Sequence, residues 1–182
     1  MARASRGRTP GHPDLREEPG VGFDRFMTEP IIVPEAGAAL PGDFAVTVRV
    51  RSEQTNGALA VIEETLRPRA FIPPHVHLND VWVYVLSGEI GALVGEEVRT
   101  ARQGDWALKP RDVQHAMWNP AERPARIIEV LTPGGTERWF EEIAGLDDDD
   151  EAGFDEISSR YGITFFPQST WIAELRRRFA LD

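Results

Sequence analysis

The sequence predicts a mostly β fold, an antiparallel sandwich or barrel, with helices added at its C-terminal end. Many short apolar or alternating runs have the length of strands, and Pro, Gly and Asn residues that favour turns separate them. Beyond Pro133-Gly134-Gly135, apolar residues recur at helical spacing instead of strand spacing. Together these observations define the predicted fold class.

The predicted strands occupy the middle of the chain. Asn56-Gly57, Ser87-Gly88 and Asn119-Pro120 are dipeptides typical of turns, and they lie between successive apolar runs. Pro73-Pro74 keeps the chain extended just before His75. The predicted strands are Ala45–Val50, Ala58–Leu66, Val81–Leu86, Ile90–Val94, Asp105–Leu108, His115–Trp118 and Arg126–Leu131.

Helices are predicted after the strands. Apolar residues recur at helical spacing over 139–146, and the segments Phe154–Tyr161 and Thr170–Phe179 are also read as helices. Ser169 or Thr170 is suited to cap the last helix, because its hydroxyl can accept a hydrogen bond from a free N–H group of the first turn. The acidic run Asp147–Glu151 is predicted to be a solvated linker, since it lacks the alternating ligands and the glycine of a calcium loop.

The chain has 182 residues, a length that suits one domain with a substantial core. Residues 1–26 are rich in Arg, Gly and Pro and show no periodicity, so they are predicted to be a disordered N-terminal arm. We therefore expect three segments, namely this arm, a β domain over residues 27–135 and C-terminal helices over residues 136–182.

Composition and charge argue against several classes of protein. The formal net charge is −10, so nucleic acid phosphates and anionic lipid surfaces would repel the chain, and neither is expected as a partner. The absence of cysteine excludes disulfides and cysteine-ligated zinc. No apolar run is long enough to cross a bilayer, and no apolar stretch follows the N-terminal arginines. A cytoplasmic protein is therefore expected.

The histidines are the residues best suited to chemistry. The chain has four, and His12 lies in the predicted arm. His75 and His77 are two residues apart, so on an extended strand both side chains point to one face. His115 lies on a distant predicted strand that a folded sheet could bring beside them. Such a set suits a divalent transition metal, while the alternative is a group of ordinary half-buried histidines with hydrogen-bond partners.

The spacing around these histidines resembles the two motifs of the cupin superfamily. In the first motif, His75-Val76-His77 is followed by Val81 and, further on, by Gly88. The second motif runs from Gly104 through Pro110 and His115 to Asn119. The resemblance covers about residues 45–133. This part of the chain is similar to small, single-domain, quercetinase-like bacterial cupins. It implies a double-stranded β-helix, or jelly-roll, barrel with His75, His77 and His115 as metal ligands.

The sequence departs from these motifs at the usual fourth ligand. A glutamate commonly stands there, and this chain has Val81 or, in the longer spacing, Trp82. The neighbouring Asp80 would ligate only if the turn after His77 redirected it. Three neutral ligands would leave the charge of the metal uncompensated, which favours an anionic oxygen from the substrate. The other possible consequence is weaker metal binding, up to loss of the metal.

The remaining site residues follow from strand alternation. Glu129 shares a face with Ile127 and Leu131, so it is a candidate base or a partner of a histidine, with a solvent-facing or Arg-paired glutamate as the alternative. Asp80 is the second candidate base. An apolar and aromatic lining suited to a flat ligand is predicted. The predicted pocket residues are Phe71, Val81, Val83, Trp106, Leu108 and Met117.

The function these residues suggest is that of a metal-dependent dioxygenase acting on a small aromatic or enolisable molecule. The metal would be Fe, Ni, Mn, Cu, Co or Zn, because imidazole ligands are shared by many ions. The alternatives are a non-catalytic cupin that binds a small molecule, and a metal-dependent cyclase or isomerase. The resemblance also implies a homodimer, in which an edge strand such as Ile31–Val33 pairs across protomers.

Overall fold

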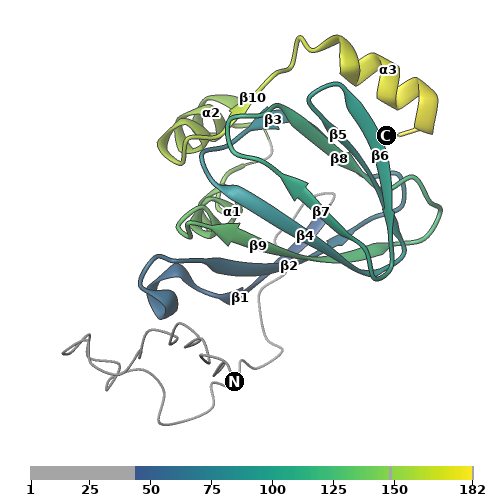
Figure 1. Ribbon diagram of the computed structural model, residues 1–182. Coiled ribbons are helices and arrows are strands. Elements are labelled where there is room, and N and C mark those ends of the chain that lie inside the picture. The colour runs from purple at the N-terminus through teal and green to yellow at the C-terminus, as the bar shows by residue number, and fades with distance from the viewer. Residues whose placement is uncertain (1–43, 148, 182) are drawn as a thin grey trace, which may run out of the picture. The chain divides into compact units, whose positions relative to one another are not determined.

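The strands form two antiparallel sheets (Figure 1). The computed structural model describes residues 44–147 and 149–181. The first sheet has the strand order β1-β2-β9-β4-β7, and the second has the order β10-β3-β8-β5-β6. The strands are β1 (Phe44–Val50), β2 (Ala60–Leu66), β3 (Phe71–Val76), β4 (Asp80–Ser87), β5 (Glu89–Val94), β6 (Glu97–Arg102), β7 (Trp106–Lys109), β8 (His115–Trp118), β9 (Ala125–Thr132) and β10 (Thr164–Phe165).

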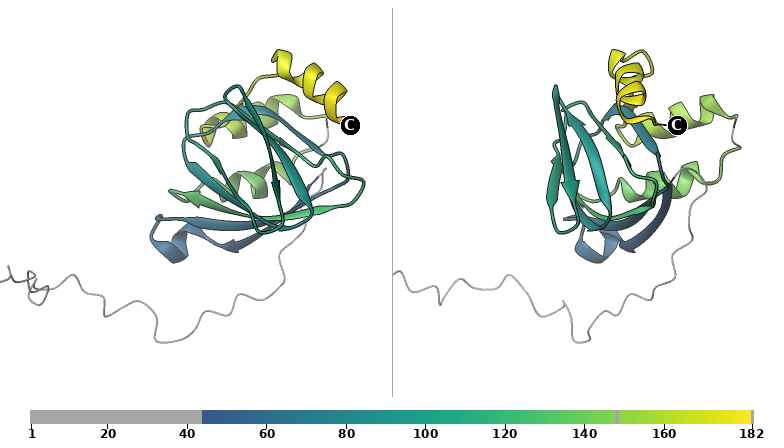
Figure 2. Two further views of the ribbon diagram at one scale, coloured as in Figure 1. Left: turned by 45° about the vertical axis from the view of Figure 1, so that its right-hand side comes forward. Right: turned by 90° about the vertical axis from the view of Figure 1, so that its right-hand side faces the viewer.

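The mostly β prediction is confirmed, with one correction to the expected barrel. Strands β1 and β7 end the first sheet, and β10 and β6 end the second. Within the described residues no strand ladder joins one sheet to the other, so the sheets do not close into a barrel. The fold is a jelly roll of two sheets, with helices at its C-terminal end (Figure 2).

Alternating burial explains why the two sheets face each other. Every second residue of β2 and of β9 is buried. Fully burying a large aliphatic side chain stabilises the fold by about 1.5–3 kcal/mol, so these apolar faces drive the two sheets together. The main hydrophobic cluster draws on both sheets, and its members include Val46, Ile62, Leu66, Val83, Val85, Ile90, Met117, Ile127 and Leu131.

Helix α3 (Thr170–Phe179) covers the other face of the second sheet. Residues of β8 alternate, so Trp118 points away from the main cluster and packs with Leu93 and Leu175. Gly91 lies opposite Trp118 in the register of β5 and β8, where its missing side chain leaves space for the indole ring. Ser169 is the N-cap of α3, as expected, although its side chain makes no capping hydrogen bond.

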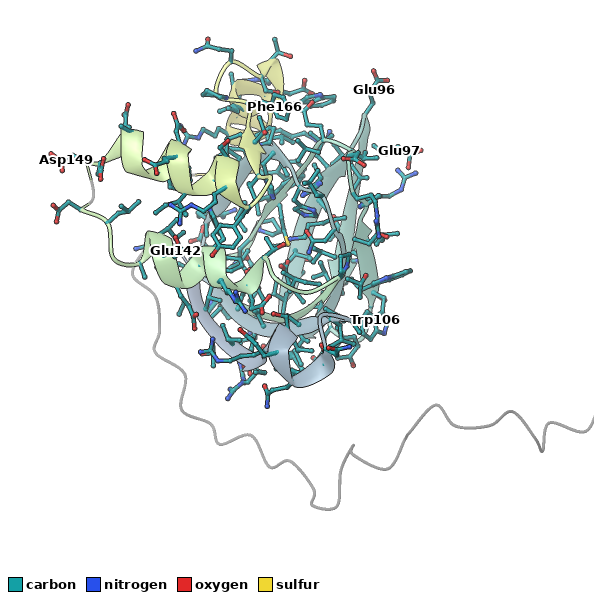
Figure 3. All side chains as sticks on the ribbon, turned by 90° about the vertical axis from the view of Figure 1, so that its left-hand side faces the viewer. Glu96, Glu97, Trp106, Glu142, Asp149 and Phe166 are labelled. Atoms are coloured by element: carbon teal, nitrogen blue, oxygen red, sulfur yellow. The ribbon has the colours of Figure 1, made fainter. Side chains whose placement is uncertain are left out.

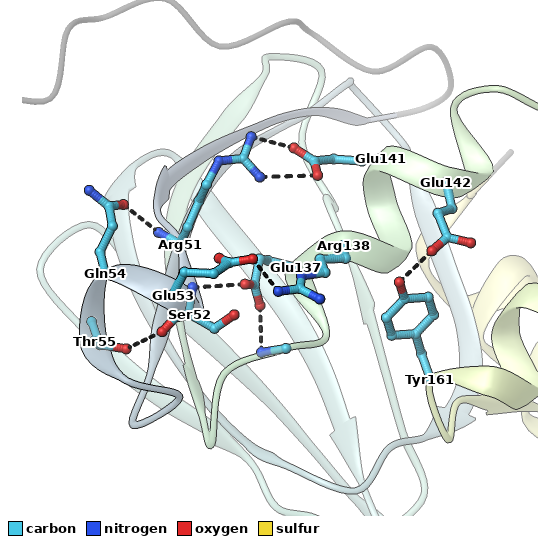
Figure 4. Close-up of polar contacts among 11 residues, drawn as sticks. Arg51, Ser52, Glu53, Gln54, Thr55, Glu137, Arg138, Glu141, Glu142 and Tyr161 are labelled. Carbon is cyan, nitrogen blue, oxygen red and sulfur yellow. Dashed lines mark hydrogen bonds and ion pairs between the residues drawn. The ribbon is translucent and has the colours of Figure 1, made fainter.

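Helix α1 (Glu137–Ile143) is attached to the turn between β1 and β2 (Figure 4). This turn is a short 3-10 helix, η1 (Ser52–Thr55). The fully buried Glu137 accepts hydrogen bonds from the backbone N–H groups of Ser52, at 2.9 Å, and Gly135, at 2.6 Å. Because both donors are backbone groups, this carboxylate fixes the start of α1 against the first sheet.

Polar contacts also hold the outer side of α1 and join it to helix α2 (Glu151–Arg160). Arg51 donates two hydrogen bonds to Glu141, at 3.1 and 2.6 Å. Glu142 accepts a hydrogen bond from the hydroxyl of Tyr161, the C-cap of α2 (Figure 4). Such contacts add modestly to stability, but they fix where the two helices lie.

Strands β3, β6 and β10 are not among the predicted strands, although the chain was expected to be extended at Pro73-Pro74 in β3. Four of the six residues of β6 are exposed and three of these are charged, so the strand lacks the apolar alternation on which the prediction rested. Strand β10 has two residues and exists because it pairs with β3. None of the helices in the described part of the chain is long and apolar enough to cross a membrane.

The described residues all fall in one compact unit, Val33–Asp182. The predicted arm over residues 1–26, with His12, and the predicted strand Ile31–Val33 lie outside the described residues. The boundary between residues 135 and 136 remains a prediction, as does the dimer.

Candidate metal centre

Three histidines from two neighbouring strands meet inside the fold. His75 in β3 and His115 at the start of β8 are paired in the sheet register, and His77 follows the end of β3. The Nε2 atoms of His75 and His115 are 3.1 Å apart. Potential ligand atoms of the three residues all lie within 4.8 Å of one another, and all three side chains are buried. The predicted grouping is therefore present.

Backbone carbonyl groups fix the orientation of each ring. In every case Nδ1 contacts the carbonyl oxygen of a residue two positions away. A carbonyl oxygen only accepts, so Nδ1 carries the hydrogen and Nε2 presents a lone pair. The contacts are His75 Nδ1 with Pro73 O at 2.8 Å, His77 Nδ1 with Asn79 O at 2.7 Å, and His115 Nδ1 with Val113 O at 2.8 Å.

These lone pairs lack donors among the described residues. Nε2 of His77 is buried and has no hydrogen-bond partner there. The Nε2 atoms of His75 and His115 face each other, and both are acceptors. Leaving a buried acceptor unsatisfied costs about 1–3 kcal/mol. A divalent cation would satisfy all three atoms at once, so this donor set fits a transition metal held by imidazole.

Burial keeps the rings neutral. The pKa of His75 is lowered to about 3 and that of His77 to about 4, because burial disfavours the charged ring and the positive charge of Lys109 adds to the effect. The pKa of His115 is also lowered, by burial and by the neighbouring His75. Neutral imidazole is the form that binds metals, so the site is ready for an ion at physiological pH.

His75 and His77 lie on the wall of a cavity of about 960 Å³. The strands and their connections contribute four further polar residues, Glu64, Asn79, Lys109 and Glu129, beside apolar ones such as Val81. The other side is formed largely by the helices and β10. A cavity of this size suits a small molecule. The apolar residues on the helical side are Trp139, Phe140, Ile143, Leu146, Phe154, Ile163 and Phe165.

A family comparison identifies the fold that carries this site. The family described as "Cupin domain" matches residues 62–131, a segment that includes all three histidines. Residues 62–131 form a cupin domain. No curated protein sequence matches the chain significantly.

Solved cupin-like structures resemble this cupin at low sequence identity. An RmlC-like cupin from Shewanella frigidimarina is 18% identical, with a TM-score of 0.49 over 56% of this chain and 86% of the other. A protein with a double-stranded β-helix domain from Klebsiella pneumoniae is 22% identical, with a TM-score of 0.49 over 60% and 93%. The polyketide cyclase RemF from Streptomyces resistomycificus is 16% identical, with a TM-score of 0.48 over 58% and 80%.

The structure does not bring Asp80 to the histidines. Val81, at the position of the usual cupin glutamate, is 2% exposed and lines the cavity. Successive residues of a strand point to opposite faces, so an inward Val81 turns Asp80 outward. There the Asp80 carboxylate accepts hydrogen bonds from the backbone N–H and the guanidinium of Arg111, both at 2.9 Å. The prediction that Asp80 is a candidate ligand or base is therefore wrong.

Glu129 does lie inside the fold. It is 2% exposed, lines the cavity and accepts a hydrogen bond from Lys109 Nζ at 2.5 Å. Lys109 is not among the predicted site residues, since it lies just beyond the predicted strand Asp105–Leu108. Glu64, which is 2% exposed and lines the same cavity, is not among them either. Strand alternation could have indicated Glu64, since it shares the inward face of β2 with Ile62 and Leu66.

Most of the other predicted pocket residues lie elsewhere. Val81 is on the cavity wall, but Val83 and Met117 pack in the main cluster and Phe71 packs beneath α3. Trp106 is 58% exposed, on the side of the sheets away from α1 and α2 (Figure 3), and Leu108 shares its face of β7. Lys109 points inward, so the alternation of β7 places Trp106 and Leu108 on the outer face. The prediction that these two residues line the pocket is therefore wrong.

The buried Glu64 is expected to make stability depend on pH. Burial and the negative charge of Glu129 raise its pKa from 4.5 to about 8 in the folded protein. Between these values the unfolded chain loses the proton and the folded protein keeps it. The free energy of unfolding should therefore fall as pH rises, by up to about 1.4 kcal/mol per pH unit. Urea unfolding across this range would show a shallower slope for Glu64→Gln, and parallel curves for the two proteins would contradict the prediction.

Proposed function

We propose that this cupin is a metal-dependent dioxygenase that acts on a small aromatic or enolisable molecule. The observation that carries the proposal is the convergence of three neutral histidines, with Nε2 unprotonated, beside a cavity of about 960 Å³. Their donor set suits Fe, Ni, Mn, Cu, Co or Zn. When bound, such a metal supplies a positive charge that attracts an anionic oxygen and stabilises negative charge developing on the substrate.

The chain's own residues support a preference for an anionic substrate oxygen. The three ligands are neutral, and Val81 replaces the usual carboxylate, so nothing in the ligand set offsets the charge of the ion. The aromatic side of the cavity suits a planar ring. Phe165 illustrates this, since its ring stacks on His75 with the ring centres 5.2 Å apart. Helices α1 and α2 contribute several residues to this side of the cavity.

Oxygen consumption would test the reaction. We expect the protein, reconstituted separately with each candidate metal, to consume dioxygen with at least one of three substrate classes: flavonols, catechols and diketones. The His75→Ala/His115→Ala double variant should lower this rate by at least about 100-fold, because altering even the supporting shell of a metal site costs about 10–100-fold.

A matched pair of variants compares a substitution in the cavity with a substitution on the outer surface. Phe140→Ala should lower kcat/KM, because Phe140 lines the cavity, whereas the exposed Trp106→Ala should leave it unchanged. A protein that binds metal but consumes no oxygen with any substrate of the panel would contradict the dioxygenase.

A cyclase or isomerase is the second candidate, and one specific observation favours it. Glu64, Lys109 and Glu129 place groups that can carry protons on the cavity wall, and proton transfer in a metal-bound substrate needs no oxygen. Conversion of a substrate under strictly anaerobic conditions would identify this class. Binding of a ligand without any conversion would instead identify a small-molecule-binding cupin.

A further inference from the structure

The cavity wall contains two buried carboxyl groups and one buried ammonium group. Glu64 of β2 and Glu129 of β9 are each 2% exposed, and Lys109 of β7 is 7% exposed. Glu64 and Glu129 are diagonal neighbours on the inner face of the first sheet, since Ile62 pairs with Glu129. Ionising both carboxyl groups would leave one buried negative charge without compensation, which is strongly unfavourable.

The contacts decide which carboxyl group keeps a proton. Lys109 Nζ is 2.5 Å from Glu129 Oε1, so this pair is charged and mutually satisfied. Glu64 has no such partner within the described residues, and its Oε2 atom is buried without a hydrogen bond. A protonated carboxyl group avoids the charge. Burial and the nearby Glu129 carboxylate both raise the pKa of Glu64, while Lys109 opposes them with a smaller effect.

The group also lies where a bound molecule would be. Glu64, Lys109 and Glu129 line the same cavity as His75 and His77. The positive charge of Lys109 lowers the pKa of each of the three histidines. In the metal-free protein the three histidines are neutral, so they add no charge that would draw the proton from Glu64.

We propose that Glu64 is a neutral carboxylic acid that donates a proton, or a hydrogen bond, to a molecule held at the three histidines. This role rests on the proposed function, because it requires that a substrate binds there. In the transfer, the O–H bond of Glu64 breaks as an O–H or C–H bond of the substrate anion forms. The carboxylate left behind shares the single ammonium of Lys109 with Glu129, so it is a strong base and takes up a proton from solvent to restore the neutral acid.

Infrared spectroscopy of the metal-free protein tests whether Glu64 is protonated. At neutral pH we expect the carbonyl stretch of a protonated carboxylic acid, shifted by isotope exchange in D₂O. It should disappear in Glu64→Gln and persist in Glu63→Gln. Glu63 is the matched control, because it precedes Glu64 on β2 but faces outward, where it pairs with Arg49 and Arg126. A wild-type spectrum without the band would overturn the proposal even if Glu64→Gln failed to fold, and so would a band that survives in a folded Glu64→Gln.

Chemical labelling tests whether the proton faces the cavity. Dicyclohexylcarbodiimide adds to protonated carboxylic acids in apolar surroundings; the acid proton passes to nitrogen and the oxygen bonds to the central carbon. We expect one adduct on Glu64 by peptide mass spectrometry, absent in Glu64→Gln and retained in Glu63→Gln. A Glu64 that shows the infrared band yet resists the reagent would be closed off from the cavity, and the proposed role would be wrong. Neither measurement needs metal or oxygen, so failure here is distinct from failure of the dioxygenase.

Discussion

Replacing His75 and His115 together by alanine is expected to abolish metal binding. Elemental analysis of the untagged wild-type protein should find about one equivalent of a transition metal, as for a site with three protein ligands. The double variant should contain almost none. The reason is geometric: the two Nε2 atoms are 3.1 Å apart in paired strands, and without them His77 is left as a single ligand.

Two controls make this result specific. His12→Ala should leave the metal content unchanged, because His75, His77 and His115 are the proposed ligands. Asp80→Asn should also retain the metal, because the structure pairs this carboxylate with Arg111 and not with the histidines. Equal metal content in the wild-type protein and the double variant would place the metal elsewhere. A wild-type protein that stays free of metal after reconstitution would contradict the proposal that this protein is a metal-dependent dioxygenase.

The second large effect is expected from Gly91→Ala. A Cβ atom added at Gly91 would lie 2.0 Å from Cε2 and 2.2 Å from Nε1 of Trp118. Trp118 is fully buried and packs against Phe179 of α3, with the ring centres 4.8 Å apart, so the indole has little room to move. Overpacking of this kind typically costs 1–3 kcal/mol, and here we expect the free energy of unfolding to fall by about 3 kcal/mol or more.

Denaturant unfolding would measure this loss against a matched substitution. Gly145→Ala adds the same methyl group where the nearest atom, Glu142 O, is 3.5 Å away, so its effect should be small. The double variant Gly91→Ala/Trp118→Phe should lose less stability than the sum of the two single changes, since the smaller ring removes the overlap. Equal losses from Gly91→Ala and Gly145→Ala would contradict the close contact.

Much of the fold and the histidine cluster could be predicted from local patterns. The two-residue spacing of His75 and His77 indicated that both could face one side of an extended segment, and the resemblance to the cupin motifs implied that His115 joins them, as it does. Alternation along β9 likewise indicated that Glu129 could face inward, as it does. In each case the signal lies within a few residues of the side chain concerned, or in a motif of fixed length.

What could not be predicted depends on contacts between distant segments. Pairing with β4, in which Lys109 lies opposite Val81, decides which face of β7 points to the cavity. The apolar character of Trp106 had suggested that the other face, with Trp106 and Leu108, would point inward. Lys109 is stable inside only because Glu129, on another strand, accepts its hydrogen bond. The placement of α1 likewise rests on Arg51 and Glu137, which connect segments far apart in the sequence.

Strand β10 has a consequence for how this protein can diversify. Its two residues pair with β3, so that Phe165 lies opposite His75, while the cavity wall continues along the chain to Arg176. The cupin domain match ends at residue 131, so most of the residues that line the cavity lie beyond the segment that holds the histidines. If the cavity takes the substrate, as proposed above, mutations in the C-terminal segment are expected to change which molecule is accepted while leaving the histidines intact. We expect natural variants of this chain to differ most in specificity where they differ after residue 136.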